Sequence, residues 1–179
     1  MLFTEQFLSG VYVIELELIE DKRGYFTRTF CKKEFQQLGM HDSYVQGNTA
    51  YNKERGTVRG MHYQSSPYEE AKIVSCTQGA IMDVIVDIRE FSSTFGRVLN
   101  VELTEECGKI LYIPEGFAHG FQTLTDNTKV CYQMSEYYHP ESSRGISPLD
   151  PELSIDWPLE IAEISDKDKK LPWLADVGF

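Results

Sequence analysis

The chain has 179 residues and a mass of 20.6 kDa, the size of one ordinary domain. Its 17 Lys and Arg against 28 Asp and Glu give a net charge of −11, and a field of that sign repels nucleic acid and anionic lipid. With 41% hydrophobic and 25% charged residues, the composition excludes a disordered or collagen-like chain. We therefore expect one folded domain over residues 1–179 that binds neither nucleic acid nor membrane.

The cysteines and the opening residues indicate a compartment. Four cysteines, at positions 31, 76, 107 and 131, have no CxxC spacing, which favours reduced thiols. The opening MLFTEQF lacks the basic and apolar regions of a secretion signal. The longest apolar stretches are interrupted by acids and fall far short of the ~20 residues that a membrane helix needs. A cytoplasmic protein is expected.

Period-two alternation is the main structural signal along the chain. Apolar side chains alternate with glutamates over residues 14–18 and with Cys131 and Gln133 over 130–134, which predicts half-buried strands. Turn residues separate runs of about five to nine residues, as in an antiparallel sandwich or barrel. These turns lie at 21–24, 78–79, 106–108 and 114–116. The fold is therefore predicted to be mostly β.

Helix is scarce. Residues 32–38, which Gly39 follows, place Phe35 and Leu38 on one face and predict a helix of about two turns. After Tyr138 the pattern loosens into prolines and a charged piece, so residues 139–179 are predicted to form loops and short helix that cover the barrel.

The segment 56–64, Gly-Thr-Val-Arg-Gly-Met-His-Tyr-Gln, places Arg59 and His62 in one predicted strand. A core strand avoids buried charge, so these side chains indicate a pocket. The alternative is a hydrogen-bonded core histidine beside a solvated arginine. Strict alternation puts the two on opposite faces, and both reach one ligand only if Gly60 lies at a bulge or twist.

Charged residues also interrupt the next two predicted strands. Lys72 opens the apolar run 71–76 and shares a face with Val74; it is either a pocket lysine or a strand-end lysine that reaches water. Asp83 and Asp87 share one face of residues 82–88, giving that strand a polar and an apolar face. We interpret both aspartates as supporting charge partners for Arg59 and Lys72.

Two further side chains have competing interpretations. His119 lies in the aromatic and glycine cluster 116–121, which could equally be a close-packed strand. Tyr132 shares its face with Val130 and Met134, so packing is its simplest role. Metal-binding β-barrels often carry HxH on one strand, and that motif is missing here, so we expect no metal.

Taken together, these segments resemble the dTDP-4-dehydrorhamnose 3,5-epimerase family, whose members are metal-free, cupin-like sugar-nucleotide epimerases. The resemblance runs over nearly the whole chain and implies an antiparallel β-sandwich or jelly-roll barrel with no cofactor. The segments that carry it are Asp21–Phe26, Val45–Asn48, Val58–Gln64, Asp83–Arg89, Ser93–Gly96, Ile113–Phe121, Tyr137–Tyr138 and Ile155–Pro158.

The resemblance also implies roles. The family's substrate is a nucleotide-linked 4-keto-6-deoxyhexose, whose C3 and C5 hydrogens are acidified by the ketone, so inversion needs a base on one face and an acid on the other. His62 matches the family's base, Asp168 its carboxylate partner and Tyr132 the acid. Lys72 matches the group that stabilises negative charge on O4.

The substrate contacts that the resemblance implies surround the sugar diphosphate. The N-terminal segment, residues 1–30, reaches into the partner's site in the family, which implies a homodimer with exchanged strands. The residues are Arg23, Phe26, Arg28, Gln46, Asn48, Arg59, His119, Tyr138, Ser143 and Lys167.

Three departures from the family pattern stand out. Arg28 and Ser143 occupy positions where the family usually has glutamates that contact substrate, and residues 148–150 replace a Trp-Asn-Asp. They suggest the same chemistry on another nucleotide or sugar. Alternatives are therefore a C3-only or C5-only epimerase of a CDP- or GDP-linked sugar, a 3,4-ketoisomerase and a non-catalytic carbohydrate-binding β-barrel. A metal-dependent cupin enzyme is a further rival.

Overall fold

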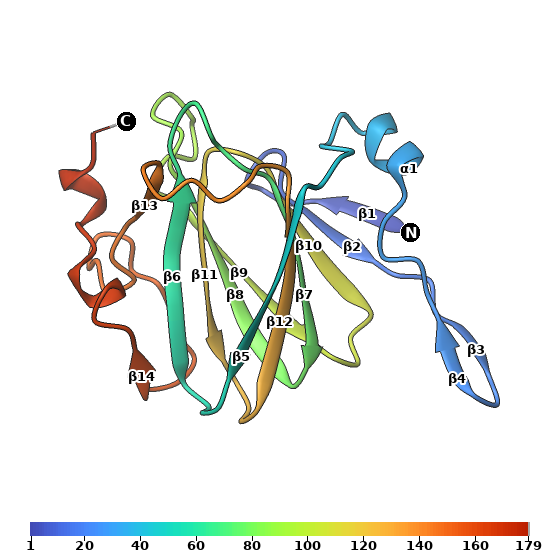
Figure 1. Cartoon of the computed structure of the whole chain (residues 1–179). Coiled ribbons are helices and arrows are strands. Elements are labelled where there is room, and N and C mark those ends of the chain that lie inside the picture. The colour runs from blue at the N-terminus through green and yellow to red at the C-terminus, as the bar shows by residue number, and fades with distance from the viewer. Residues whose placement is uncertain (179) are drawn as a thin grey trace.

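The computed structural model describes residues 1–178, and two β-sheets stacked face to face form its body (Figure 1). The first sheet has the order β1 (Leu2–Glu5), β2 (Tyr12–Glu15), β10 (Lys109–Ile113), β7 (Lys72–Gln78), β12 (Thr128–Met134) and β5 (Gln46–Asn52). The second has the order β13 (Ser143–Gly145), β6 (Thr57–Gln64), β11 (Phe117–Thr123), β8 (Ala80–Asp87) and β9 (Val98–Thr104). All of these pairings are antiparallel, so the predicted mostly β sandwich is confirmed.

The main core lies between the sheets, where alternate side chains of each strand point inward. Its fully buried members include Val74, Leu111 and Val130 from the first sheet and Ile81 and Ile85 from the second. At one end of the sandwich this apolar filling gives way to polar side chains, and the pocket described below opens there.

Strand β8 corrects the expectation of one apolar and one polar face. Ile85, on the side predicted to be polar, packs into the inter-sheet core. Val84 and Val86 point to the other side, where Ile146 and Leu174 of the C-terminal tail cover them. The second sheet is thus covered on both faces, and a strand in that setting carries apolar side chains on both.

The predicted tail over the sandwich is confirmed. After β13 the chain packs along the outer face of the second sheet, and β14 (Glu163–Ile164) pairs in parallel with β6 (Figure 1). Two short 3-10 helices follow, η1 (Asp168–Lys170) and η2 (Leu174–Asp176). No helix within residues 1–178 is long and apolar enough to cross a membrane.

The predicted helix is α1 (Lys32–Gln37). It ends one residue before the predicted end, and Leu38 is its cap residue. Its Phe35 is fully buried against aromatic rings on the outer face of the first sheet. The strand predicted over 14–18 is shorter than expected: β2 ends at Glu15, although the backbone N–H of Leu16 still donates to the backbone oxygen of Gly108 at 2.7 Å.

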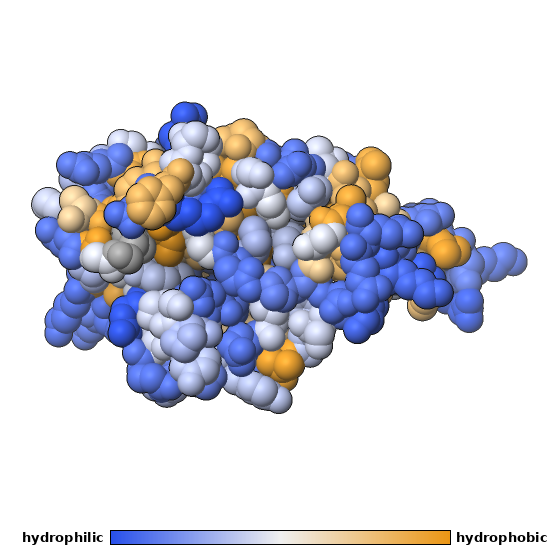
Figure 2. All heavy atoms as spheres, turned by 90° about the horizontal axis from the view of Figure 1, so that it is seen from above, coloured by the Kyte–Doolittle hydropathy of each residue, from blue (hydrophilic) through white to orange (hydrophobic). Residues whose placement is uncertain are grey.

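A hairpin of β3 (Ile19–Asp21) and β4 (Gly24–Phe26) projects from the body (Figure 1). Seen from above, it is a mainly hydrophilic extension with an apolar patch (Figure 2). Tyr25 and Phe26 are 59% and 69% exposed, which is unusual for aromatic side chains in a strand pair.

Asp87 does not have the partners that were predicted for it. Its carboxylate does not support Arg59 or Lys72; it accepts hydrogen bonds from the Arg89 guanidinium at 2.7 and 2.9 Å and from the hydroxyls of Ser92 and Thr94. Burial would raise the pKa of Asp87, but the bonds from Arg89, Thr94 and Ser92 lower it to about 2. Asp87 therefore fixes the turn between β8 and β9.

Asp87→Asn should lower the free energy of unfolding by about 2 kcal/mol at pH 7. The folded-state pKa lies below the unfolded value of 3.8, so this stabilisation is present above about pH 4 and is lost as the pH falls towards 2. Urea unfolding of both proteins between pH 7 and 3 measures the difference, which should shrink with acid. The exposed Asp156→Asn is the control, and a difference that does not change with pH would contradict the assignment.

Candidate active site

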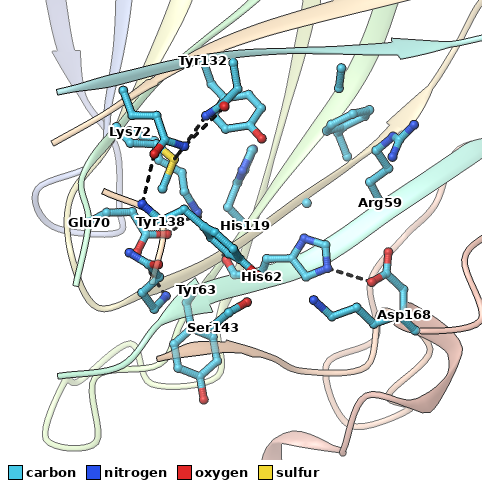
Figure 3. Close-up of a pocket in the computed structure, with 18 of the residues that line it drawn as sticks. Arg59, His62, Tyr63, Glu70, Lys72, His119, Tyr132, Tyr138, Ser143 and Asp168 are labelled. Carbon is cyan, nitrogen blue, oxygen red and sulfur yellow. Dashed lines mark hydrogen bonds and ion pairs between the residues drawn. The ribbon is translucent and has the colours of Figure 1, made fainter. Parts of the chain in front are cut away.

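A cavity of about 480 Å³ opens at the polar end of the sandwich, between the two sheets and the tail (Figure 3). Strands β5, β6, β7, β11 and β12 supply most of its walls, and the segment before η1 closes one side. Its lining comprises Gln46, Asn48, Ala50, Arg59, His62, Tyr63, Gln64, Glu70, Lys72, His119, Gly120, Phe121, Tyr132, Met134, Tyr138, Ser143, Ser165, Lys167 and Asp168.

The irregularity that we expected at Gly60 is present. His62 pairs with His119 and Arg59 with Phe121, so β6 has one residue more than β11 between these pairs. Gly60 has a φ of +119°, and a Cβ there would lie 2.6 Å from the Cα of Gly120. This bulge turns Arg59 and His62, three residues apart, toward the same cavity.

His62 is hydrogen-bonded to a buried carboxylate (Figure 3). Its Nε2 lies 2.7 Å from Oδ1 of Asp168, and the other oxygen, Oδ2, accepts the backbone N–H of Gly60. Burial would raise the pKa of Asp168, but the hydrogen bond and charge of His62, with Gly60 and Ser165, hold it below its usual value. An ionised Asp168 fixes the imidazole tautomer and leaves the second ring nitrogen to accept a proton.

Tyr132 reaches the cavity from the other sheet. It lies on the inward face of β12, two residues after the core residue Val130, and it pairs with Asn48 of β5 and Val74 of β7. Burial raises the pKa of Tyr132, Arg59 opposes that change, and Glu70 adds to it. The phenol thus keeps its proton at neutral pH and can donate it.

Lys72 is a pocket lysine, 7% exposed, and not a strand-end lysine in water. Its Nζ lies 2.8 Å from Oε1 of Glu70 and donates to the backbone oxygen of His62 at 3.4 Å. A buried cation needs such partners to offset its lost hydration. The predicted shared face with Val74 is confirmed, since both side chains point between the sheets.

The aspartate predicted to support Arg59 or Lys72 binds a different group. Asp83 is fully buried, and its Oδ1 lies 2.5 Å from Nε2 of His119. Arg59 is held instead by Asn52, whose Oδ1 accepts its Nε–H at 2.6 Å. The interpretation of Asp83 as a charge partner of Arg59 and Lys72 is therefore wrong.

Five of the remaining predicted contacts line the mouth of the cavity or its walls. The Gln46 side chain donates to Asn48 and accepts the backbone N–H of Tyr138, which fixes that tyrosine's backbone beside the opening. Ser143 and Lys167 complete this group, one from β13 and one from the residue before η1.

Three predicted contacts lie outside the cavity. Arg23 and Phe26 belong to the projecting β3–β4 hairpin, where Arg23 pairs with Asp21. Arg28 lies just beyond the hairpin and is 3.5 Å from Glu34. Within one chain these residues do not reach the cavity that holds His62.

Glu70 holds Lys72 and Asn52 holds Arg59, and neither of these partners was predicted from the sequence. Glu70 lies two residues before Lys72, a spacing that puts neighbouring side chains on one face of an extended chain, so a signal for it existed. Nothing in the sequence pairs Asn52 with Arg59, because a turn separates β5 from β6.

The antiparallel sandwich thus holds a carboxylate-bound histidine, a tyrosine and a lysine in one cavity between its sheets. The sequence model described as dTDP-4-dehydrorhamnose 3,5-epimerase matches residues 5–176. The chain belongs to the dTDP-4-dehydrorhamnose 3,5-epimerase family.

Individual relatives and solved structures support membership of the same family. The enzyme of that name from Methanothermobacter thermautotrophicus is 42% identical over 170 residues, which are 93% of this chain and 91% of the relative. The crystal structure of the one from Elizabethkingia anophelis has a TM-score of 0.95 and 37% identity, covering 100% of this chain and 99% of that one. A Legionella pneumophila epimerase in complex with dTDP-4-keto-L-rhamnose has a TM-score of 0.93 and 39% identity, covering 98% and 94%.

Gly120→Ala should destabilise the protein, because the added Cβ would lie 2.5 Å from the Arg59 backbone oxygen and 2.6 Å from Met61 Sδ. We expect a loss of about 1–3 kcal/mol in the free energy of unfolding, measured by urea titration. Gly47→Ala in β5 is the matched control, since its Cβ meets nothing within 4 Å. Equal stability of the two variants would show that β6 and β11 do not depend on this close approach.

Proposed function

We propose that the protein inverts C3, C5 or both in a nucleotide-linked 4-keto-6-deoxyhexose, most simply the dTDP-linked sugar. One observation carries the proposal: the carboxylate-bound His62 and the protonated Tyr132 face one cavity from opposite sheets. A sugar ring between them would offer one face to a base and the other to an acid.

The reaction is a proton removal followed by a proton return. His62 takes the proton from the carbon beside the ketone, the electron pair of that C–H bond forms a C=C bond to C4, and the C4=O4 π pair moves to O4, which gives an enolate. The O4 charge is stabilised by Lys72. Tyr132 then donates its phenolic proton to the opposite face of the same carbon, which inverts it without net oxidation, and solvent restores both side chains.

Local positive charge supports a diphosphate beside the sugar. The chain carries a net charge of −11, so its overall field opposes an anionic ligand. Arg59 and Lys167 nevertheless line the cavity, and both are exposed enough to reach a ligand at its mouth. A guanidinium and an ammonium are suitable partners for a pyrophosphate.

Incubation in D₂O with dTDP-, CDP-, UDP- and GDP-linked 4-keto-6-deoxy sugars tests the proposal. Proton NMR should show deuterium at each inverted carbon and should identify the preferred nucleotide. A carbonyl moved from C4 to C3 would indicate a ketoisomerase, and no label on any ketosugar would reject the epimerase.

His62→Ala and Tyr132→Phe should each lower kcat by about 10²–10⁴-fold. Both should keep the wild-type circular dichroism spectrum, because the two side chains line a cavity and are only partly buried. Tyr51→Phe, which removes an exposed phenol that donates to Asn127, is the matched control and should retain activity. An unfolded His62→Ala would reassign His62 to structure.

The projecting hairpin supports a second element of the proposal, a homodimer in which the β3–β4 hairpin within residues 1–30 of each chain completes the partner's site. Arg23 and Phe26 belong to a hairpin that stands away from its own body, with Phe26 69% exposed (Figure 1). An exposed aromatic side chain and an arginine on one hairpin are suited to an interface and to a nucleotide.

Sedimentation should give a mass twice the 20.6 kDa of the chain. Arg23→Ala should raise KM for the preferred substrate by about 10-fold, as expected for a lost charged contact. Lys22→Ala, on the same hairpin, is the control and should change KM little. A monomer with full activity would reject the exchange.

A further inference from the structure

Glu70 is a buried carboxylate in the cavity that neither the base nor the acid uses. The residue is 8% exposed, and its two oxygens have different partners: Oε1 lies 2.8 Å from Lys72 Nζ, and Oε2 accepts the backbone N–H of Gln64 at 3.1 Å. Glu70 is therefore fixed at both oxygens, and one of them holds the lysine proposed to stabilise O4.

The geometry around the Lys72 ammonium defines what it can offer a ligand. An ammonium has three N–H donors. One is directed to Glu70 Oε1 and a second to the backbone oxygen of His62 at 3.4 Å. These two acceptors anchor Nζ to the strand that carries the base, and the third N–H remains for a carbonyl oxygen in the cavity.

The buried charges of Lys72 and Glu70 depend on each other. Lys72 and Glu70 are 7% and 8% exposed, so neither is well hydrated, and removing one of a buried pair leaves the other uncompensated. Without Glu70 the Lys72 ammonium would lose its nearest anchor and turn toward water, so it would no longer aim an N–H at the substrate. Figure 3 shows Glu70 and Lys72 on one side of the cavity and Asp168 on the other, with His62 between them.

We infer that Glu70 is a positioning residue for the reaction: it fixes the position and direction of the Lys72 ammonium, as Asp168 fixes His62. The inference rests on the proposed function, because it assumes that Lys72 meets the ketone oxygen. It assigns to the cavity two carboxylates, one supporting the base and the other supporting the lysine at O4.

A double-mutant cycle on the full-length protein tests this role, with the preferred 4-keto-6-deoxy sugar as substrate. Glu70→Gln should lower kcat by about 10–100-fold with KM changed less than about threefold, and Lys72→Met should lower kcat by about 10²–10³-fold. In the Lys72→Met background, Glu70→Gln should change kcat by less than about twofold, because a residue that acts through Lys72 has nothing left to position.

The controls separate positioning from folding. Glu69→Gln, the neighbouring carboxylate, should keep wild-type kcat, and urea unfolding of each variant reports stability independently. Losses in kcat that multiply in the double variant, or a Glu70→Gln enzyme within twofold of wild type, would overturn the inference while wild-type turnover leaves the proposed function intact. A wild-type protein that turns over no ketosugar would overturn both.

Discussion

A charged side chain buried between two sheets needs a partner, and the cavity of this protein is built around that requirement. Asp168 holds His62, Glu70 holds Lys72, and Asp83 holds His119. Asp168 joins the tail to β6, Asp83 joins β8 to β11, and Glu70 links Lys72 to the backbone N–H of Gln64 in β6. The contacts that offset desolvation therefore also fix the reacting groups. The buried polar groups of this site are therefore also held in fixed positions.

The base and the acid come from different sheets because the cavity lies between the two sheets. His62 comes from the second sheet and Tyr132 from the first, so the distance between base and acid is set by the stacking of the sheets. That stacking depends on the apolar core below the cavity, in which Val130 and Ile85 are fully buried. Core packing thus affects the geometry of the reaction through residues such as Val130 and Ile85, which do not line the cavity.

Alternation and turn spacing predicted the mostly β sandwich. The three-residue spacing of Phe35 and Leu38 predicted the short helix, and the prolines after Tyr138 predicted the covering tail. The motif around His62 indicated a pocket but left a core histidine as the alternative, and Gly60 was rightly identified as the place where strict alternation fails. The partner assignments of Asp83 and Asp87 were wrong because alternation gives a face of a strand but not the residue opposite it. That information lies in sheet order, which places Asp83 beside β11 and its His119.

The same limit explains why the roles of the N-terminal contacts could be predicted only through resemblance. Nothing in the local sequence of residues 19–26 says that the hairpin leaves its own body, although its exposed aromatics make that plain once the fold is known. Glu70, by contrast, could have been found from its spacing to Lys72.

Asp168 comes from the tail, which lies on the outside of the second sheet and is attached through the short β14 pairing and apolar contacts of residues such as Leu174. The base is therefore assembled from two parts of the molecule that need not melt together. On warming, detachment of this tail would remove the carboxylate from His62 while both sheets persist, so catalytic competence would vanish at a lower temperature than β-structure does.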